Sequence, residues 1–400
     1  MQSKIEQIQI PLNNIYQKSW IKNKTVLALG PELKSNYAVI INSQAIVYTG
    51  FGDLKNPDNF TRYKKHILKT IKNLSKKPQV IACDFNPIFL SSQFARKLQA
   101  STLGKSKLNP VLHHYAHIAA SCAVLNLMQT QVLGIVCDGT GLGDDDQTWG
   151  CEFIKKSAGN FTRCGHLNYI PLPGADYAVI EPWRVGLSLL YQTFGDKIFT
   201  LDLALLKHHQ DKTNILVKMI KQGFNTPMAS SAGRLFDGVA AILGFFKKIK
   251  FEAQAAVLLE QQAQKVINYE KGKYAYKIQK AGLKFILNTN ELIEDIVADL
   301  RANQPKEIIA ARFHNTFSDM IIKMAGKITQ QKENSKIKDI VLSGGVFFNR
   351  IISDKVIRGL EKYGFKVHKP ENLILSDAGL SLGQAVIGYV FRNSGKGKKN

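Results

Sequence analysis

Hydrophobic residues in the first part of the chain occur in short apolar runs separated by turns. Runs over residues 25–29, 37–41 and 44–48 each predict a strand, and Gly30-Pro31 supplies a turn after the first. Strands joined by tight turns at the start of a lobe predict an antiparallel meander.

Longer segments with helical spacing then alternate with apolar strands. Helices are expected over 63–74, 89–98 and 113–127, and strands over 79–83 and 111–112. This alternation predicts an α/β lobe over residues 24–130, preceded by a polar N-terminal extension over residues 1–23.

The same order of elements begins again at residue 131. An apolar strand over 132–137 leads through a glycine-rich turn into a second strand over 148–154, and a largely helical region follows over about 181–270. We therefore predict a second lobe over 131–378 with a helical insertion. The strand expected at 340–342 belongs to this lobe, and a weak duplication of this kind is typical of two-lobed nucleotide-binding proteins.

The composition is compatible with two lobes and with a reducing compartment. The chain has 400 residues, of which 45% are hydrophobic, and no apolar run approaches the roughly 20 residues that span a bilayer. Residues 1–6 lack the apolar block of a secretory signal. The five cysteines are odd in number and form no C-x-x-C pair, which argues against a disulfide framework or a zinc finger. We expect a cytoplasmic protein without a membrane anchor.

The formal charge of +23 allows two interpretations. It could mark a nucleic-acid or acidic-protein partner. It could also be a bias of composition, since only ten of the 54 basic residues are arginine, the better reader of phosphates and bases. We favour the second interpretation and do not expect nucleic-acid binding.

Two histidines indicate a metal site. His113 and His117 are four residues apart in an expected helix, so both rings point to one side. Imidazole binds divalent first-row metals, and Asp377 could supply a third ligand and leave coordination positions open. The alternative is that two histidines beside an alanine-rich run simply pack in a core.

Two glycine turns follow apolar strands and indicate a nucleotide site. In Asp138-Gly139-Thr140-Gly141, backbone N–H groups could hold a phosphate, while Asp138 holds a metal-bound phosphate or orients a nucleophile. The alternative for this turn is an ordinary hairpin. In the segment 343–349, Gly344 and Gly345 could lie against adenine or ribose with Asn349 as a polar anchor, unless this is only a strand-to-helix turn.

A helix start near residue 232 adds a possible anion site. Gly233 lies where helical N–H groups are free, and Arg234 could add charge to a phosphate or pair with Asp237. Glu252 could contact ribose or cap a helix. The sequence contains no G-x-S-x-G, no P-loop and no arrangement that favours a catalytic cysteine.

Taken together, these motifs resemble the C-terminal module of the HypF family, the carbamoyltransferases of [NiFe]-hydrogenase maturation. The resemblance covers about residues 27–384 and rests on eight motifs in order, at 113–120, 138–141, 149–153, 171–174, 181–184, 230–237, 343–350 and 377–384.

The resemblance implies a TsaD-like, two-lobed actin-like (ASKHA, RNase H-like) ATPase fold of the α/β class. It also implies that the terminal helix, 379–393, returns to the first lobe ahead of a disordered tail at 394–400, because Asp377 must reach the histidines. The implied reaction moves a carbamoyl group from carbamoyl-adenylate to the C-terminal cysteine thiolate of a HypE-type protein and releases AMP. The product becomes the cyanide ligand of the hydrogenase iron.

The resemblance also assigns roles to residues. The metal ligands would be His113, His117 and Asp377, for Fe, Zn or Mg, and the catalytic set would be His113, His117 and Asp138. Contacts to an adenine nucleotide (ATP, AMP or carbamoyl-adenylate) would come from Asp138, Gly139, Thr140, Gly141, Gly174, Asp176, Gly233, Asp237, Glu252, Gly344, Gly345 and Asn349.

Some family features are missing. A full HypF begins with acylphosphatase, zinc-finger and YrdC-like domains, so carbamoyl-adenylate is expected from a separate YrdC-like protein. Four residues depart from the family pattern in ways that narrow the pocket, namely Cys151, Ala253, Phe348 and Ala378. The alternatives are a small-molecule O-carbamoyltransferase, a non-catalytic nucleotide-binding scaffold, and tRNA threonylcarbamoyl transfer, which Glu181-Pro-Trp-Arg184 disfavours.

Overall fold

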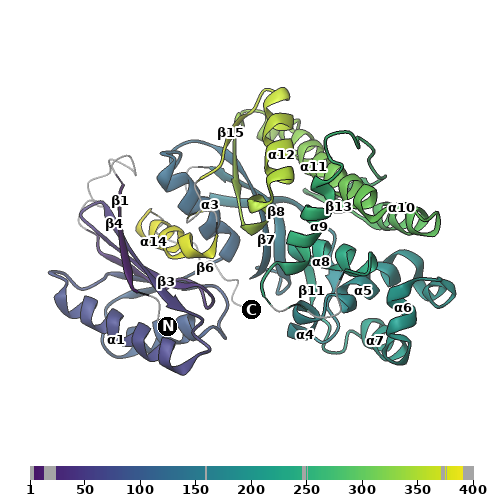
Figure 1. The fold of residues 1–400 in the computed structure, drawn as a ribbon. Coiled ribbons are helices and arrows are strands. Elements are labelled where there is room, and N and C mark those ends of the chain that lie inside the picture. Colours follow the sequence, from purple (N-terminus) through teal and green to yellow (C-terminus); the bar gives the residue numbers. More distant parts are fainter. Residues whose placement is uncertain are drawn as a thin grey trace.

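The protein is built from two mixed β-sheets with helices on their outer faces and two helices between them (Figure 1). The computed structural model describes residues 4–12, 24–157, 160–245, 249, 251–370, 374 and 376–390. The predicted tail at 394–400 and residues 13–23 of the predicted extension lie outside the described residues.

The first sheet has the order β1-β4-β3-β2-β5-β6. Its strands are β1 (Glu6–Pro11), β2 (Val26–Ala28), β3 (Ser35–Ile41), β4 (Gln44–Gly52), β5 (Val80–Asp84) and β6 (Lys107–Val111). The expected antiparallel meander is β2-β3-β4, and β5 and β6 add to it in parallel.

The N-terminal boundary of this sheet differs from the prediction. β1 pairs with β4 in antiparallel register, so residues 6–11 are part of the first sheet and not of a separate extension. Ile8 and Ile10 pack against the core between the sheets, while the glutamines beside them face outward. The alternation of glutamine and isoleucine over residues 7–10 is too short to predict a strand firmly in a polar segment.

The second sheet has the order β12-β13-β9-β8-β7-β14-β15, with β10 and β11 attached at β8. Its strands are β7 (Val132–Leu142), β8 (Thr148–Ser157), β9 (Asn160–Leu167), β10 (Ile170–Pro171), β11 (Met228–Ser231), β12 (Lys277–Ala281), β13 (Lys284–Asn288), β14 (Asp339–Ser343) and β15 (Lys366–His368). β11 lies inside the region over about 181–270 that was predicted as largely helical, and it pairs in parallel with β8.

The predicted duplication is visible in the strand order. In the first sheet, the strands lie side by side in the order β4-β3-β2-β5-β6, so the first three are placed in reverse and the last two follow beside β2. The strands β7, β8, β9, β14 and β15 have the same arrangement in the second sheet. Each lobe therefore repeats an antiparallel meander followed by two parallel strands, which confirms the two-lobed actin-like fold.

Amphipathic helices cover the outer faces of both sheets. α1 (Pro57–Asn73) and α2 (Leu90–Ala100) bury Tyr63, Ile67 and Phe94 against the first sheet. α1 begins earlier than predicted because the Asn56 side chain caps its first turn and Pro57 suits that position. The second lobe carries α4 (Asp176–Ile180), α5 (Trp183–Phe194), η1 (Gly195–Thr200), α6 (Ala204–His208), α7 (Gln210–Gln222), α8 (Ala232–Ile242), α9 (Gln254–Gln264), α10 (Asn290–Arg301), α11 (Lys306–Thr329), η2 (Lys332–Asn334), η3 (Gly345–Phe348), α12 (Arg350–Lys362) and η4 (Asp377–Gly379).

Two helices cross from one lobe to the other and lie side by side between the sheets (Figure 1). α3 (His113–Val124) follows β6 but packs on β7 and β14, whereas α14 (Leu380–Val390) follows β15 but packs on β2, β3 and β5. Over its described residues, 380–390, the terminal helix therefore packs on the first sheet, and residues 391–393 of the predicted helix lie outside the described residues. The histidine pair, predicted as part of the first lobe, lies on a helix that packs against the second sheet.

A glycine sets the distance between these two helices. A Cβ atom on Gly383 of α14 would lie 1.8 Å from the carbonyl oxygen of Ala116 on α3. Only glycine allows the two backbones to approach this closely. Gln384 adds a buried hydrogen bond, because its Oε1 accepts from the N–H of Gly30 at 2.8 Å. This packing fixes α14 between α3 and the first sheet.

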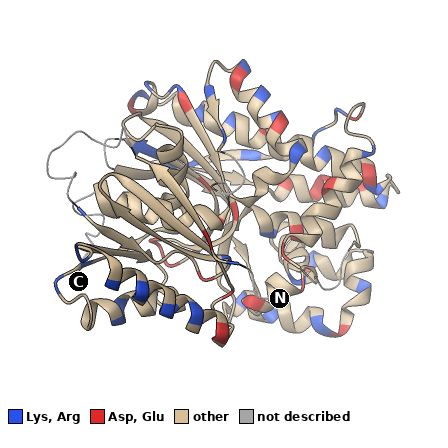
Figure 2. Ribbon diagram, turned by 60° about the vertical axis from the view of Figure 1, so that its left-hand side comes forward, with Lys and Arg blue, Asp and Glu red and all other residues tan. Residues whose placement is uncertain are grey.

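Charge is distributed unevenly over the surface. Lys and Arg recur along α1 at the outer face of the first lobe (Figure 2), where Arg62, Lys64, Lys65, Lys69 and Lys72 outnumber the single acidic residue Asp58. Within the described parts of the chain, no helix is both long enough and apolar enough to cross a bilayer.

Candidate metal centre and adjoining cavity

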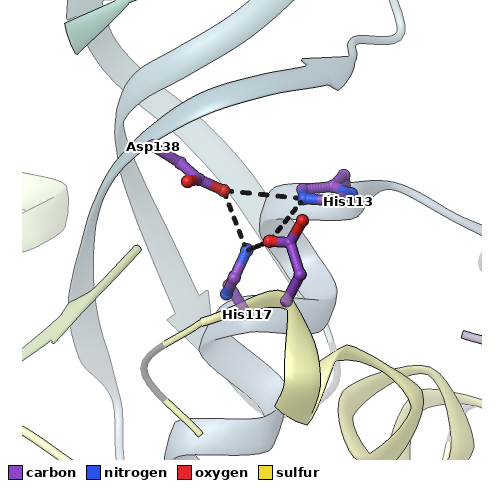
Figure 3. A group of neighbouring side chains, drawn as sticks. His113, His117 and Asp138 are labelled. Atoms are coloured by element: carbon purple, nitrogen blue, oxygen red, sulfur yellow. Dashed lines mark hydrogen bonds and ion pairs between the residues drawn. The ribbon is translucent and has the colours of Figure 1, made fainter. Parts of the chain in front are cut away.

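Four side chains from three separate elements converge between the lobes. His113 and His117 come from the first turns of α3, Asp138 from β7, and Asp377 from η4. One ligand atom from each lies within 4.8 Å of the others. Figure 3 shows His113, His117 and Asp138 pointing toward one another. The three predicted metal ligands are therefore brought together, and Asp138 joins them as a fourth.

The distances fit a shared cation. Nε2 of His117 lies 3.1 Å from Oδ2 of Asp138 and 3.4 Å from Oδ1 of Asp377, and Nε2 of His113 lies 3.6 Å from each of the same oxygens. A metal about 2.1 Å from every ligand would separate neighbouring ligand atoms by about 3.0–3.4 Å. Nε2 of His113 is buried and has no hydrogen-bond partner in the described part of the chain, as expected of an atom that serves a cation.

The histidines and carboxyls of the cluster shift one another's pKa values. Burial disfavours the charged imidazoles, but the neighbouring carboxylates of Asp138 and Asp377 outweigh it and raise the pKa of both His113 and His117. Burial opposes ionisation of the carboxyls as well, yet the histidines hold the pKa of Asp138 well below its usual range and that of Asp377 at about 2. Two carboxylates this close need positive charge between them, from protons or from a metal.

Groups behind the ligands fix their orientation. Asp84, fully buried at the end of β5, lies 3.1 Å from Nδ1 of His113. A carboxylate accepts, so Nδ1 donates to Asp84 and Nε2 is the ring nitrogen that would bind a metal after losing its proton. The backbone N–H of Gly345 donates to Oδ1 of Asp138 at 3.4 Å, which turns Oδ2 toward the histidines. Ser343 Oγ lies 3.5 Å from Nδ1 of His117.

A cavity of about 300 Å³ adjoins the cluster. That volume is at the lower end of the range for small-molecule sites. Eight residues predicted from the sequence line it, namely Asp138, Gly139, Gly233, Asp237, Glu252, Gly345, Asn349 and Asp377. Two ligand carboxylates therefore form part of the cavity wall, so a bound molecule would contact the metal directly.

Other predicted residues lie outside this wall. Thr140 is exposed, Gly174 lies in the turn before α4, and Asp176 is the first residue of α4. Gly141 and Gly344 serve backbone packing instead. A Cβ on Gly141 would be 2.7 Å from Cβ of His113, and one on Gly344 would be 2.3 Å from the carbonyl oxygen of Cys137. The geometry gives these five residues no direct contact with a ligand in the cavity.

Two cationic residues also line the cavity, Arg234, which the sequence analysis considered, and Lys34, which it did not. Lys34, on the turn between β2 and β3, forms a 2.8 Å ion pair with Glu252 at the start of α9. Arg234 forms a buried 2.9 Å ion pair with Asp237, as one of its two expected roles required. Arg234 also lines the cavity. Lys34 follows a strand to which the sequence analysis gave no role in binding, and its place in the cavity is seen only in the folded structure.

The cysteines have no place in the chemistry of this site. All five are free and buried. Burial raises the pKa of Cys83 and Cys122 to about 12 and that of Cys137 well above its usual value. Thiols in such surroundings are poor nucleophiles.

Comparison with known proteins identifies the family. Residues 21–124 match the HypF Kae1-like domain, and residues 134–384 match the family described as carbamoyltransferase, Kae1-like domain, second subdomain. The carbamoyltransferase HypF of Synechocystis is 32% identical over 374 residues, which cover 90% of this chain and 46% of that protein. A carbamoyltransferase HypF homolog of Cupriavidus necator is 32% identical over 365 residues, covering 90% of both chains.

The fold has a solved counterpart. A crystal structure of full-length HypF in the phosphate- and nucleotide-bound form matches with a TM-score of 0.83 and 31% identity, over 96% of this chain and 57% of that one. The chain thus spans about half the length of several relatives it matches. Both family matches cover successive parts of one two-lobed unit. The protein belongs to the HypF carbamoyltransferase family and corresponds to its Kae1-like module.

Proposed function

We propose that this chain transfers a carbamoyl group from carbamoyl-adenylate to the C-terminal cysteine thiolate of a HypE-type protein. The observation that supports this most strongly is the four-ligand cluster of His113, His117, Asp138 and Asp377 opening into a cavity of ligand size. Relatives named as HypF carbamoyltransferases make carbamoyl transfer the reaction class to test first.

The residues present fit a divalent cation. Of the three expected metals, Fe and Zn suit two imidazoles and two carboxylates, whereas Mg prefers oxygen ligands alone, and the paired carboxylates would neutralise the charge of such an ion. When bound, the cation would stabilise negative charge on a phosphate leaving group. His113 and His117 would hold the cation together with Asp138 and Asp377, and these two carboxylates also line the cavity where a ligand would bind.

The cavity also suits an adenine nucleotide. Asp138, Gly139, Gly233 and Gly345 would surround the phosphate end, since Gly345 lies beside the Asp138 carboxylate. The residues that line the cavity include two cations and five carboxylates, so an anionic ligand needs the metal together with Lys34 and Arg234. One solved relative is described as phosphate- and nucleotide-bound, which supports this ligand class.

In the proposed step, the thiolate sulfur attacks the carbamoyl carbon. A C–S bond forms, the C–O bond to the phosphate breaks, and AMP leaves with the electron pair. The chain holds the acyl donor in line by fixing its phosphate, so the reaction gains from orientation and from charge stabilisation. We place the reaction in the cytoplasm, since it needs a reduced thiol, and we assign the adenylate supply to a separate YrdC-like protein.

The test combines purified protein, a HypE-type protein and a YrdC-like adenylate-forming protein. Mass spectrometry of the HypE-type protein should show a carbamoyl increment on its C-terminal cysteine. A His117→Ala variant should give no increment, whereas Lys65→Met on the remote face of α1 should match the wild type. Transfer to a small alcohol or to tRNA, with the thiol unmodified, would contradict the proposed acceptor.

A further inference from the structure

One end of the cavity presents an aromatic ring. Phe348 ends η3, lines the cavity and keeps 46% of its surface exposed. A single exposed phenyl ring on a convex surface has no particular meaning. A ring that lines a cavity instead offers a flat apolar face to whatever binds there.

The apolar side of α9 lines the same cavity. Ala256 and Val257 line the cavity, and Val257 is 41% exposed. They precede Glu260 by four and three residues and so share its side of the helix. Oε1 of Glu260 accepts from the backbone N–H of Arg350 at 2.7 Å, which fixes α9 beside the segment that carries Phe348. The two apolar surfaces therefore belong to one slot.

Polar groups at this end are already engaged by the protein. Nδ2 of Asn349 lies 3.0 Å from Nε2 of His314, and Oδ1 of Asn349 accepts from the N–H of Ile352 at 3.0 Å. Glu260 is engaged by Arg350 as described. A ring in the slot thus meets two apolar faces and few free donors or acceptors along its edge.

We propose that Phe348 stacks on the nucleobase opposite α9, and that this end of the cavity selects a flat purine by stacking and not by its hydrogen-bonding edge. The inference rests on the proposed nucleotide function and adds a residue and a mode of recognition to it. Stacking on an aromatic side chain tolerates different bases, and its loss weakens binding by roughly 5- to 150-fold.

The experiment measures binding of AMP, GMP and ribose 5-phosphate to the metal-loaded protein by calorimetry. Phe348→Ala should weaken AMP by roughly 5- to 150-fold and ribose 5-phosphate by less than about twofold. Phe348→Tyr should keep the wild-type affinity, and GMP should bind wild type within about tenfold of AMP. Phe224→Ala removes a ring that is 68% exposed outside the cavity wall and should change nothing.

Several results would overturn the inference. Equal losses for AMP and ribose 5-phosphate would show that Phe348 supports the fold and not the base. An unchanged AMP affinity in Phe348→Ala, or a strong preference of wild type for AMP over GMP, would exclude selection by stacking. If the wild type transfers the carbamoyl group but binds AMP no better than ribose 5-phosphate, the stacking proposal is wrong and the proposed function stands. If it binds no nucleotide and transfers nothing, the proposed function fails with it.

Discussion

Replacing Asp84 by asparagine removes one buried negative charge and keeps the size of the side chain. In the wild type, Oδ2 of Asp84 lies 3.1 Å from Nδ1 of His113, and Oδ1 accepts from the N–H of Asn86 at 2.9 Å. Asparagine has a single acceptor oxygen, so these two donors would compete for it. His113 would lose the partner that holds its proton on Nδ1 and leaves Nε2 free for the metal.

The size of the effect follows from this position. Asp84 is fully buried, so its interaction with His113 is not screened by solvent. Removing such a partner of a ligating histidine weakens metal binding by about 10- to 100-fold, or about 1.4–2.7 kcal/mol. The remaining three ligands should still bind the metal.

Competition against a chelating dye measures this change for wild type, Asp84→Asn and the exposed control Asp58→Asn at the start of α1. Urea unfolding of the metal-free proteins checks that Asp84→Asn is folded. Metal affinity within about twofold of wild type in the folded variant would refute the role of Asp84. An equal loss in Asp58→Asn would show a nonspecific charge effect.

Three further predictions concern protons, packing and phosphate. Because the histidine pKa values are raised from 6.5, apparent metal affinity should rise with pH from about 6 to 8 in dye competition. In the metal-free protein, the stabilising contribution of the two histidines should be complete below pH 6.5 and be lost as pH rises through their raised pKa values, as urea titrations would show. Gly383→Ala should lower the free energy of unfolding in urea by about 1–3 kcal/mol, because the added Cβ would collide with the backbone of Ala116. The control Gly326→Ala should not lower it, because the nearest atom to its added Cβ is 3.6 Å away. Lys34→Met should weaken AMP by about 10- to 100-fold but adenosine by less than twofold in calorimetry, and equal losses would contradict a phosphate contact.

The parts of the fold with strong local signals were predictable from the sequence. The apolar runs that became β2, β3, β4, β5 and β7 have clear strand patterns, and the i, i+4 spacing of the histidines placed both on one side of α3. The repeated order of elements identified two lobes. These features depend on near neighbours in the chain, which is the information a periodic pattern carries.

What the sequence missed depends on contacts between distant segments. The pairing of β1 with β4 and of β11 with β8 has weak local signals. Asp138 was predicted at the phosphate, but its place among the metal ligands depends on how the end of β7 meets α3. Asp84 and Lys34 lie far from the recognised motifs and reach the site only because the first sheet faces the cleft.

The central claim is that one cation binds between the lobes and faces the phosphate of a nucleotide. A crystal structure of the protein with metal and AMP, with anomalous data at the metal edge, tests it most directly. We predict a single anomalous peak about 2.0–2.3 Å from His113, His117, Asp138 and Asp377, with a phosphate oxygen at an open coordination position. A peak elsewhere, or AMP bound away from these four side chains, would contradict the account.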